Sequence, residues 1–354
     1  MSRFMSSKYA ALKPYTPGEQ PRGRQYIKLN TNESPFPPSP LAQQYAKEQA
    51  SQLELYSDPC CTDLTKKAAQ VLGIGEDEII FTNGSDDALN FAFMAFCDSD
   101  HPAVFPDISY GFYKVFAQLN NIPYREIPLK EDFTIDIQDY CTAEGTVFIA
   151  NPNAPTGLCL SLADIETILK SNPNRVVVID EAYVDFGGES ALALIHQYSN
   201  LLVVQTFSKS RSMAGARLGF AAGSKELIAD LNTLKFSTNP YNVNRMTMAA
   251  GVGSLEDQQY FRSCVERVKQ CRRWTRQQLD LLGMTTLDSS TNFVFTKHSA
   301  IPGQVLYSKL RDRGILIRHF DTPRLTDFIR VTIGDEQQMA AFISAMKEIL
   351  EETV

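Results

Sequence analysis

Two clusters of reactive residues follow apolar runs of this 354-residue chain. Asp180 and Glu181 end the run Val176–Ile179, and a carboxylate that closes a buried strand is costly unless a cation faces it. Lys209 ends the run that begins at Leu201, where an amine is placed to form a Schiff base with a carbonyl. Taken alone, the acids also fit a helix cap or a salt bridge, and the lysine also fits an ordinary surface residue.

A third set of residues has the character of an anion site. Arg217 lies between glycines in Ala214–Gly219, where the backbone can approach a ligand and a guanidinium can bind a phosphate through two hydrogen bonds. The segment Thr82–Asp87 precedes an apolar helix pattern, and a helix N-terminus offers free N–H groups to an anion. Its Ser85 and Asp86 also satisfy the ordinary capping rule, which is the simpler explanation when the segment is taken alone.

The elements that must position these clusters alternate along the chain. Between about residues 41 and 240, strand-like and helix-like segments follow one another, which is typical of βαβ units and a mostly parallel sheet. We predict strands at 79–81, 103–105, 124–127, 146–150, 175–180, 201–207 and 218–222, and helices near 62–72, 86–97, 109–119, 161–170, 190–197 and 224–236. Ligands bind beyond the carboxyl ends of such strands, so the clusters are predicted to meet there.

The remainder of the chain predicts two further parts. Residues 1–40 are rich in proline and read as an extended N-terminal arm with one short strand at 26–29. Residues 41–245 are assigned to a large domain and residues 246–354 to a smaller α+β domain. In the smaller domain we predict helices over 256–282, near 303–313 and near 335–352, and strands at 292–296, 315–318 and 328–333.

Composition narrows the class of protein. The formal net charge is -7 and the pI is about 5.3, so the chain lacks the basic face that nucleic acid or a membrane surface would require. Seven scattered cysteines and four histidines without ligand-like spacing indicate reduced thiols and no metal site. We expect a cytoplasmic protein, because the sequence shows no signal peptide and no stretch of 18 apolar residues.

The order of the clusters resembles the signature of the fold-type-I pyridoxal-phosphate-dependent aminotransferases of classes I and II. The resemblance is carried by Asn83–Asp86, Asn151–Gly157, Asp180–Tyr183, Ser208–Lys209 and Arg217, and it runs from about residue 26 to the C-terminus. It implies an α/β fold in which a large domain, with a mostly parallel central sheet flanked by helices, binds pyridoxal 5'-phosphate. The small domain and the arm then pack together, or the arm packs with a partner subunit.

Within that superfamily the chain is most similar to the enzymes that act on histidinol phosphate. The matching segments are Leu29–Pro35, Tyr56–Pro59, Arg318–Arg324 and Ile329–Gly334. This similarity implies a step of histidine biosynthesis in which glutamate and 2-oxoglutarate form one couple, and histidinol phosphate and imidazole acetol phosphate form the other. The implied partners are therefore a small-molecule amino donor and a keto-acid acceptor.

The resemblance also implies a role for each matching residue near the cofactor. Lys209 forms the Schiff base and moves the proton, Asp180 pairs with the ring nitrogen, and Tyr183 donates to the phenolic oxygen. The residues expected to hold the phosphate or stack on the ring are Ser85, Asp86, Ser208, Arg217 and Tyr110.

Further residues are expected to bind substrate or to come from a neighbour. Arg330 and Arg318 match residues that grip the substrate anion, and Asn32 and Tyr15 match arm residues nearby. Tyr56 matches a tyrosine that reaches the phosphate of a neighbouring subunit, which implies a homodimer with shared active sites.

One position departs from the pattern. Relatives commonly carry an asparagine immediately before Pro-Thr-Gly, where it contacts the phenolic oxygen, and this chain has Ala154 there. We expect either that Asn153 takes over that contact or that Tyr183 acts alone.

Alternatives within the same fold stay open. An aromatic-amino-acid aminotransferase or a threonine-phosphate decarboxylase would keep Lys209 and Asp180, and the residues that recognise an imidazole are not identifiable from the sequence. A non-catalytic binding or regulatory protein is disfavoured, because such proteins often lose the lysine or gain a DNA-binding segment. A nucleotide-binding enzyme is excluded, because no G-x-x-x-x-G-K-[ST] motif occurs.

Overall fold

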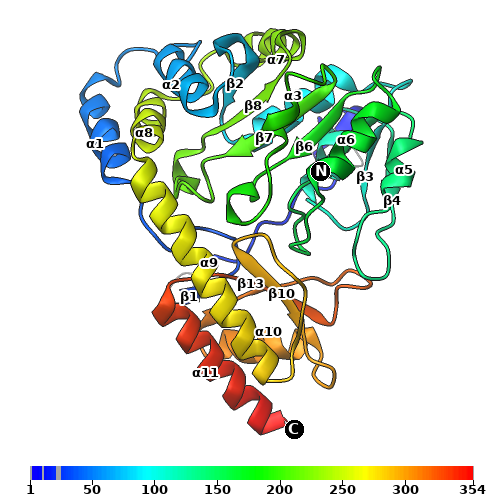
Figure 1. The fold of residues 1–354 in the computed structure, drawn as a ribbon, viewed down its shortest axis with the longest axis vertical. Coiled ribbons are helices and arrows are strands. Elements are labelled where there is room, and N and C mark those ends of the chain that lie inside the picture. Colours follow the sequence, from blue (N-terminus) through cyan, green and yellow to red (C-terminus); the bar gives the residue numbers. More distant parts are fainter. Residues whose placement is uncertain (1, 10–11, 21–24, 354) are drawn as a thin grey trace.

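A seven-stranded sheet forms the centre of the larger part of the molecule (Figure 1). The computed structural model describes residues 2–9, 12–20 and 25–353. In spatial order the strands are β2 (Ile79–Thr82), β8 (Gly219–Gly223), β7 (Leu201–Thr206), β6 (Val177–Asp180), β5 (Thr146–Ala150), β3 (Ala103–Pro106) and β4 (Tyr124–Ile127). β8 runs antiparallel to both of its neighbours, and the other adjacent pairs are parallel. The predicted α/β class is confirmed.

Helices cover both faces of this sheet. One face packs against α3 (Ser85–Phe96), α4 (Phe112–Leu119) and α7 (Lys225–Thr238). The other face packs against α5 (Ile137–Cys141) and α6 (Leu162–Ser171). Strand β6 contributes Val178 to the first core and Val177 and Ile179 to the second, so it is apolar on both faces, as a central parallel strand must be.

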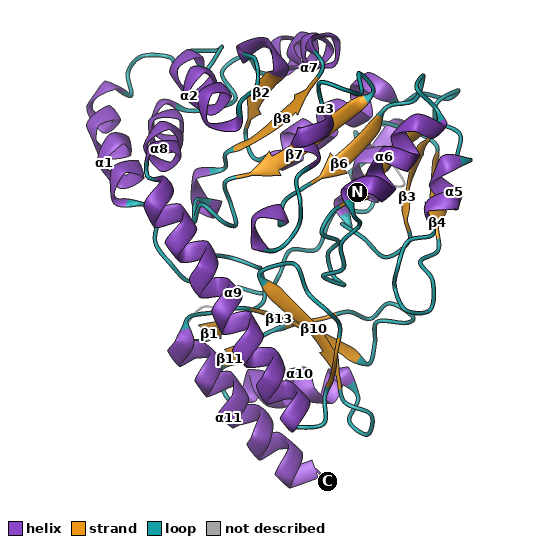
Figure 2. Ribbon diagram, in the orientation of Figure 1, coloured by secondary structure: helices purple, strands orange, loops and turns teal. Residues whose placement is uncertain are grey.

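The smaller part of the molecule contains an antiparallel sheet and three helices (Figure 2). Its strands, in spatial order, are β12 (Arg318–His319), β13 (Phe328–Thr332), β10 (Phe293–Lys297) and β9 (Thr285–Thr286). Its helices are α9 (Gln258–Leu281), α10 (Gly303–Asp312) and α11 (Glu336–Thr353). One apolar core joins α9, α10 and α11 to β10 and β13.

The N-terminal arm runs between the two parts. Its strand β1 (Ile27–Lys28) pairs in parallel with β11 (Ile315–Leu316) of the smaller part. Glu19 fastens an earlier segment of the arm, because its carboxylate accepts hydrogen bonds from Arg311 (2.6 Å) and Tyr307 (3.0 Å) of α10. These contacts hold part of the arm against β11 and α10. Residues 10–11 and 21–24 of the predicted arm lie outside the described residues.

Helices α1 (Pro40–Gln49), α2 (Thr62–Leu72) and α8 (Arg245–Glu256) pack together beside β2 and β8. Neither α1 nor α8 was predicted, and glycines inside α8 explain part of that failure because they lower helix propensity. The glycines allow α8 to pack closely on α1, because a Cβ at Gly253 would lie only 2.6 Å from the carbonyl oxygen of Leu41. Because α8 packs with the larger part, we propose that the small domain begins near Asp257, between α8 and α9, rather than at the predicted residue 246.

The other predicted elements agree with the structure to within a few residues, with two exceptions. The single strand predicted at 315–318 is instead two short strands, β11 and β12, which belong to different sheets. The helix predicted over 190–197 is wrong, because only a short 3₁₀ turn, η5 (Ala191–Leu194), forms there. The short helix α5 and the two-residue strand β9 were not predicted. None of the helices in the described ranges combines the length and the apolar character that a membrane span requires.

Gly219 allows β8 to begin beside the N-terminus of α3. A Cβ at this position would overlap the amide nitrogen of Ser85, and neither backbone can move aside easily. We predict that Gly219→Ala lowers the free energy of unfolding by about 1–3 kcal/mol, the usual cost of overpacking. Chemical denaturation measures this loss. Gly215→Ala is the matched control, because nothing lies within 4 Å of its Cβ position, and equal losses in the two variants would contradict the prediction.

Candidate active site

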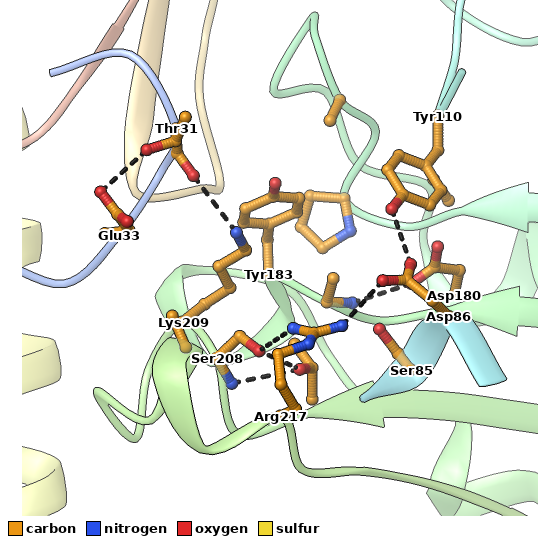
Figure 3. A pocket seen from close by; sticks show the side chains of 16 residues that line it. Thr31, Glu33, Ser85, Asp86, Tyr110, Asp180, Tyr183, Ser208, Lys209 and Arg217 are labelled. Atoms are coloured by element: carbon orange, nitrogen blue, oxygen red, sulfur yellow. Dashed lines mark hydrogen bonds and ion pairs between the residues drawn. The ribbon is translucent and has the colours of Figure 1, made fainter. Parts of the chain in front are cut away.

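A cavity opens at the carboxyl ends of β2, β5, β6 and β7, beside the start of β8. Eight of the residues predicted from the sequence line it together: Ser85, Asp86, Tyr110, Asp180, Tyr183, Ser208, Lys209 and Arg217. Their side chains converge on one space from separate elements (Figure 3). The three clusters that are far apart in the sequence therefore meet, as the rule for parallel sheets predicts.

Asp180 closes β6 as a buried carboxylate, only 5% exposed. Its Oδ2 accepts a hydrogen bond from the hydroxyl of Tyr113 (2.9 Å), and its Oδ1 accepts one from the backbone N–H of Ala182 (3.2 Å). Burial raises the pKa of Asp180 to about 6, although these hydrogen bonds and the charge of Lys209 oppose the rise. A buried carboxylate of this kind is well suited to a cationic ligand group.

Glu181 faces a different environment from its neighbour. It accepts hydrogen bonds from Ser190, from the backbone N–H of Ala191 and from Gln205, and it does not line the cavity. Burial raises the pKa of Glu181 to about 7. The two acids at the end of β6 thus have separate tasks, since Asp180 faces the cavity and Glu181 secures the turn η5.

Lys209 lies in the turn that follows β7. Its Nζ donates to the backbone carbonyl of Thr31 (3.4 Å) and lies 5.8 Å from the centre of the Tyr183 ring. The turn is fixed by a hydrogen bond from the backbone N–H of Ser208 to the hydroxyl of Thr206 (3.1 Å). Among residues 2–9, 12–20 and 25–353, the amine has no carboxylate partner at hydrogen-bonding distance, and it faces the same cavity as Asp180.

One end of the cavity has the features of a phosphate site. Arg217 contacts Asp86 through Nη2 (2.9 Å) and Ser208 through Nη1 (3.5 Å). Ser85 is the first residue of α3, where free N–H groups and the helix dipole favour an anion. Gly84, at φ 79°, keeps this end open, because a Cβ there would overlap the guanidinium of Arg217.

Tyr110 forms part of the wall on the side of α4. Its hydroxyl donates to Asp86 Oδ1 (2.7 Å), and burial with the nearby carboxylate raises the pKa of Tyr110 well above its usual value. Its ring packs edge-on against Tyr113 at 5.7 Å between centroids. The ring borders the cavity, as a residue that stacks on a bound ring would need to do.

Three consecutive residues of the arm contact three different site residues. The carbonyl of Asn30 accepts from Arg330 Nη2 (3.2 Å), and the carbonyl of Thr31 accepts from Lys209. The side-chain amide of Asn32 donates to the hydroxyl of Tyr183 (2.9 Å). The arm therefore connects the lysine, the tyrosine and an arginine of the smaller part.

A second and larger cavity adjoins the first, with a volume of about 520 Å³ against about 190 Å³. It shares Tyr110, Tyr183 and Lys209 with the first cavity. The predicted substrate residues Tyr15, Asn32, Arg318 and Arg330 also line it.

Arg318 and Arg330 are register neighbours on β12 and β13, so their side chains share one face of the small sheet. Both guanidinium carbons lie 5.5 Å from the centre of the Phe320 ring. Burial lowers the pKa of Arg330, and the charge of Arg318 lowers it further, while no carboxylate is among the groups that act on it. Two adjacent cations that form no ion pair within the described part of the chain are arranged to bind a multivalent anion.

Two predicted residues do not reach either cavity. The side-chain amide of Asn153 accepts a hydrogen bond from Ser109 (2.8 Å) and donates to the carbonyl of Ile108 (3.1 Å) and to Thr156 (3.0 Å), so it stabilises its own loop. Ala154 lines the wall of the cavity instead. Tyr56 is 80% exposed and stacks on Tyr241 at 4.6 Å.

Sequence reasoning missed Tyr113 and the carbonyl of Thr31. Tyr113 follows Tyr110 by three residues, a spacing that places two side chains on the same face of a helix, so a usable signal was present. The contact of Thr31 gave no signal, because a backbone carbonyl carries no residue type.

The comparisons with known proteins agree with this geometry. Residues 24–346 match the profile of the family "Aminotransferase class I and II", and the chain belongs to that family. A histidinol-phosphate aminotransferase of Brachyspira hyodysenteriae is 47% identical over 353 residues, 99% of this chain and 100% of the relative. One of Clostridium acetobutylicum is 44% identical over 351 residues, again 99% and 100%.

Solved structures show the same fold. The histidinol-phosphate aminotransferase of Sinorhizobium meliloti, in complex with pyridoxal-5'-phosphate, superposes with a TM-score of 0.89 at 22% identity and covers 100% of both chains. The enzyme of that name from Clostridium acetobutylicum superposes with a TM-score of 0.85 at 24% identity, covering 92% of this chain and 99% of the other.

Proposed function

We propose that the protein is a pyridoxal-phosphate-dependent aminotransferase that transfers an amino group from glutamate to imidazole acetol phosphate. The products are 2-oxoglutarate and histidinol phosphate, so the reaction belongs to histidine biosynthesis. The observation that carries this proposal is the pair Arg318 and Arg330, which line the same cavity as Lys209 and form no ion pair with any carboxylate of the described residues. The names of the full-length relatives support the same substrate.

The residues of the smaller cavity fit the cofactor in chemical type. Asp180 would face the ring nitrogen, Tyr183 the phenolic oxygen, and Tyr110 the face of the ring. Ser85, Ser208 and Arg217 would hold the phosphate, together with the N-terminus of α3. When bound, pyridoxal phosphate supplies an aldehyde that exchanges with amino groups and a ring that accepts the electron pair of the broken C–H bond.

The side chains of this protein then have distinct tasks. The Lys209 amine would hold the cofactor, and its Nζ would move the proton from the substrate α-carbon. Asp180 keeps its negative charge against the ring nitrogen and so stabilises the cation there. Tyr183, held by Asn32, donates a proton to the oxygen it faces.

The two arginines explain how one cavity serves two substrates. Glutamate presents a carboxylate and histidinol phosphate presents a phosphate, and a guanidinium can bind either through two hydrogen bonds. Two cations are better matched to the doubly charged phosphate, which favours a phosphorylated substrate over phenylalanine.

We propose a homodimer as the active form. Tyr56 does not line either cavity of its own chain, and it stands on an exposed apolar segment with Leu53 (60% exposed) and Leu55 (58% exposed). A partner subunit would bury this segment and bring Tyr56 to a phosphate site. A cytoplasmic location stays a prediction.

Lys209→Ala tests the central assignment. We predict that amino-group transfer from histidinol phosphate to 2-oxoglutarate falls more than roughly 1000-fold, because both the covalent link and the proton carrier are lost. The absorption band of the lysine-bound cofactor should vanish as well.

A panel of substrates tests the substrate assignment. The wild-type protein should prefer histidinol phosphate over phenylalanine and threonine phosphate, and a large preference for phenylalanine would contradict the proposed substrate.

Arg330→Gln and Arg318→Gln test the anion site. Each variant should lower kcat/KM for histidinol phosphate by roughly 10- to 100-fold, the worth of a charge-assisted hydrogen bond. Histidinol, which lacks the phosphate, is the control substrate, and its kcat/KM should change little in either variant. If both substrates lose activity equally, the arginines do not recognise the phosphate.

Arg217→Gln tests the cofactor phosphate site. The dissociation constant of pyridoxal phosphate should rise roughly 10- to 100-fold, because the guanidinium supplies a charge-assisted hydrogen bond that the amide cannot. The affinity for pyridoxal, which has no phosphate, should stay within about threefold, since only uncharged contacts remain. An equal loss for the two ligands would show that Arg217 acts through the fold of the loop.

A further inference from the structure

We infer that Tyr113 is a positioning residue that holds the Asp180 carboxylate in its ionised form and in one orientation toward the cofactor ring nitrogen. This inference rests on the proposed function, since it requires a cofactor at Asp180. Tyr113 lines neither cavity; its hydroxyl reaches the site through the carboxylate, and its ring packs against that of Tyr110.

The surroundings of Tyr113 leave its hydroxyl one direction to point. The side chain is fully buried, and its ring is packed by Phe93 (6.4 Å), Phe105 (5.7 Å) and Phe148 (6.0 Å), measured between centroids. In this apolar cluster the hydroxyl donates to Asp180 Oδ2 at 2.9 Å. A buried hydroxyl without a partner would be costly, so ring packing and hydrogen bonding together fix the position of the donor.

The direction of the hydrogen bond is also fixed. Burial and the charge of Asp180 raise the pKa of Tyr113 well above its usual value, so the phenol keeps its proton and donates. The second carboxylate oxygen is occupied by the N–H of Ala182. With one donor on each oxygen the carboxylate cannot rotate, and lone pairs remain for the ring nitrogen.

Other titratable groups near Asp180 and Tyr113 also shift the pKa values of these two residues. The charge of Asp86 raises the pKa of Asp180 and the charge of Lys209 lowers it, while Tyr110 and Tyr183 act on Tyr113. All of these groups remain when only the hydroxyl of Tyr113 is removed. A change in the ionisation of Asp180 in such a variant is therefore attributable to the lost donor.

Tyr113→Phe keeps the ring and removes the donor, and we test it by binding pyridoxal phosphate to the apoenzyme between pH 6 and pH 8.5. The lost hydrogen bond favoured the charged carboxylate, so its removal raises the pKa of Asp180 by about 1. As the pH is lowered, the affinity of the variant for pyridoxal phosphate therefore begins to fall at a higher pH than that of the wild type. Equilibrium dialysis should give nearly equal dissociation constants at pH 8.5 and a variant that binds about fivefold more weakly at pH 6.

Two controls separate this role from plain packing. Tyr140 is also buried, and its hydroxyl has no hydrogen-bond partner among the described residues, so Tyr140→Phe should leave the pH profile unchanged. In an Asp180→Asn background, adding Tyr113→Phe should cause no further pH-dependent loss. Thermal melting of each variant confirms that the fold is retained.

The outcomes are distinct. A Tyr113→Phe profile parallel to that of the wild type, or an equal loss in the Asp180→Asn background, would overturn the role of Tyr113. A wild-type protein that fails to bind pyridoxal phosphate at any pH would instead refute the proposed function.

Discussion

The site depends on one buried carboxylate. Asp180 ends a strand that is apolar on both faces and has a parallel neighbour on either side, so water cannot reach it easily. Its charge is costly in this position until a cation approaches, and its pKa of about 6 expresses that cost. The protein reduces the cost only partly, through Tyr113, the N–H of Ala182 and the charge of Lys209, and no arginine of the described residues forms an ion pair with the carboxylate. A ligand with a protonated ring nitrogen would supply the missing charge.

The cations of the site are separated in space, and the separation orients ligands. Arg217 stands at one end with the N-terminus of α3, while Arg318 and Arg330 come from the small sheet and line the adjoining cavity. Lys209 borders both cavities. Under the proposed function, a cofactor phosphate and a substrate phosphate would therefore have different partners.

The sequence was sufficient for the strands of the large sheet and for the residues that gather at their ends, because the carboxyl ends of parallel strands lie at the same edge of a sheet. It was insufficient where tertiary packing overrides local preference. Glycine-rich α8 forms because its small residues let α1 approach closely, and no helix propensity reveals that. Asn153 has the right residue type and position, yet its amide is consumed by Ser109, Ile108 and Thr156. Residue type alone does not predict which partners a side chain will form hydrogen bonds with.

The arm contacts parts of the chain that lie up to 300 residues away in the sequence. Asn30, Thr31 and Asn32 contact Arg330, Lys209 and Tyr183 in turn, and Asn32 also accepts from and donates to Thr332 of β13. Asn32 adopts φ 55°, a left-handed conformation that asparagine tolerates better than most residues, and this turn directs its amide to Tyr183. A displacement of the small sheet would therefore move the arm, and with it the acceptor of Lys209 and the donor to Tyr183. Arg330 and the Lys209 amine are thus linked through the backbone carbonyls of two adjacent arm residues, Asn30 and Thr31, and that link depends on the path of the arm more than on the identity of those residues.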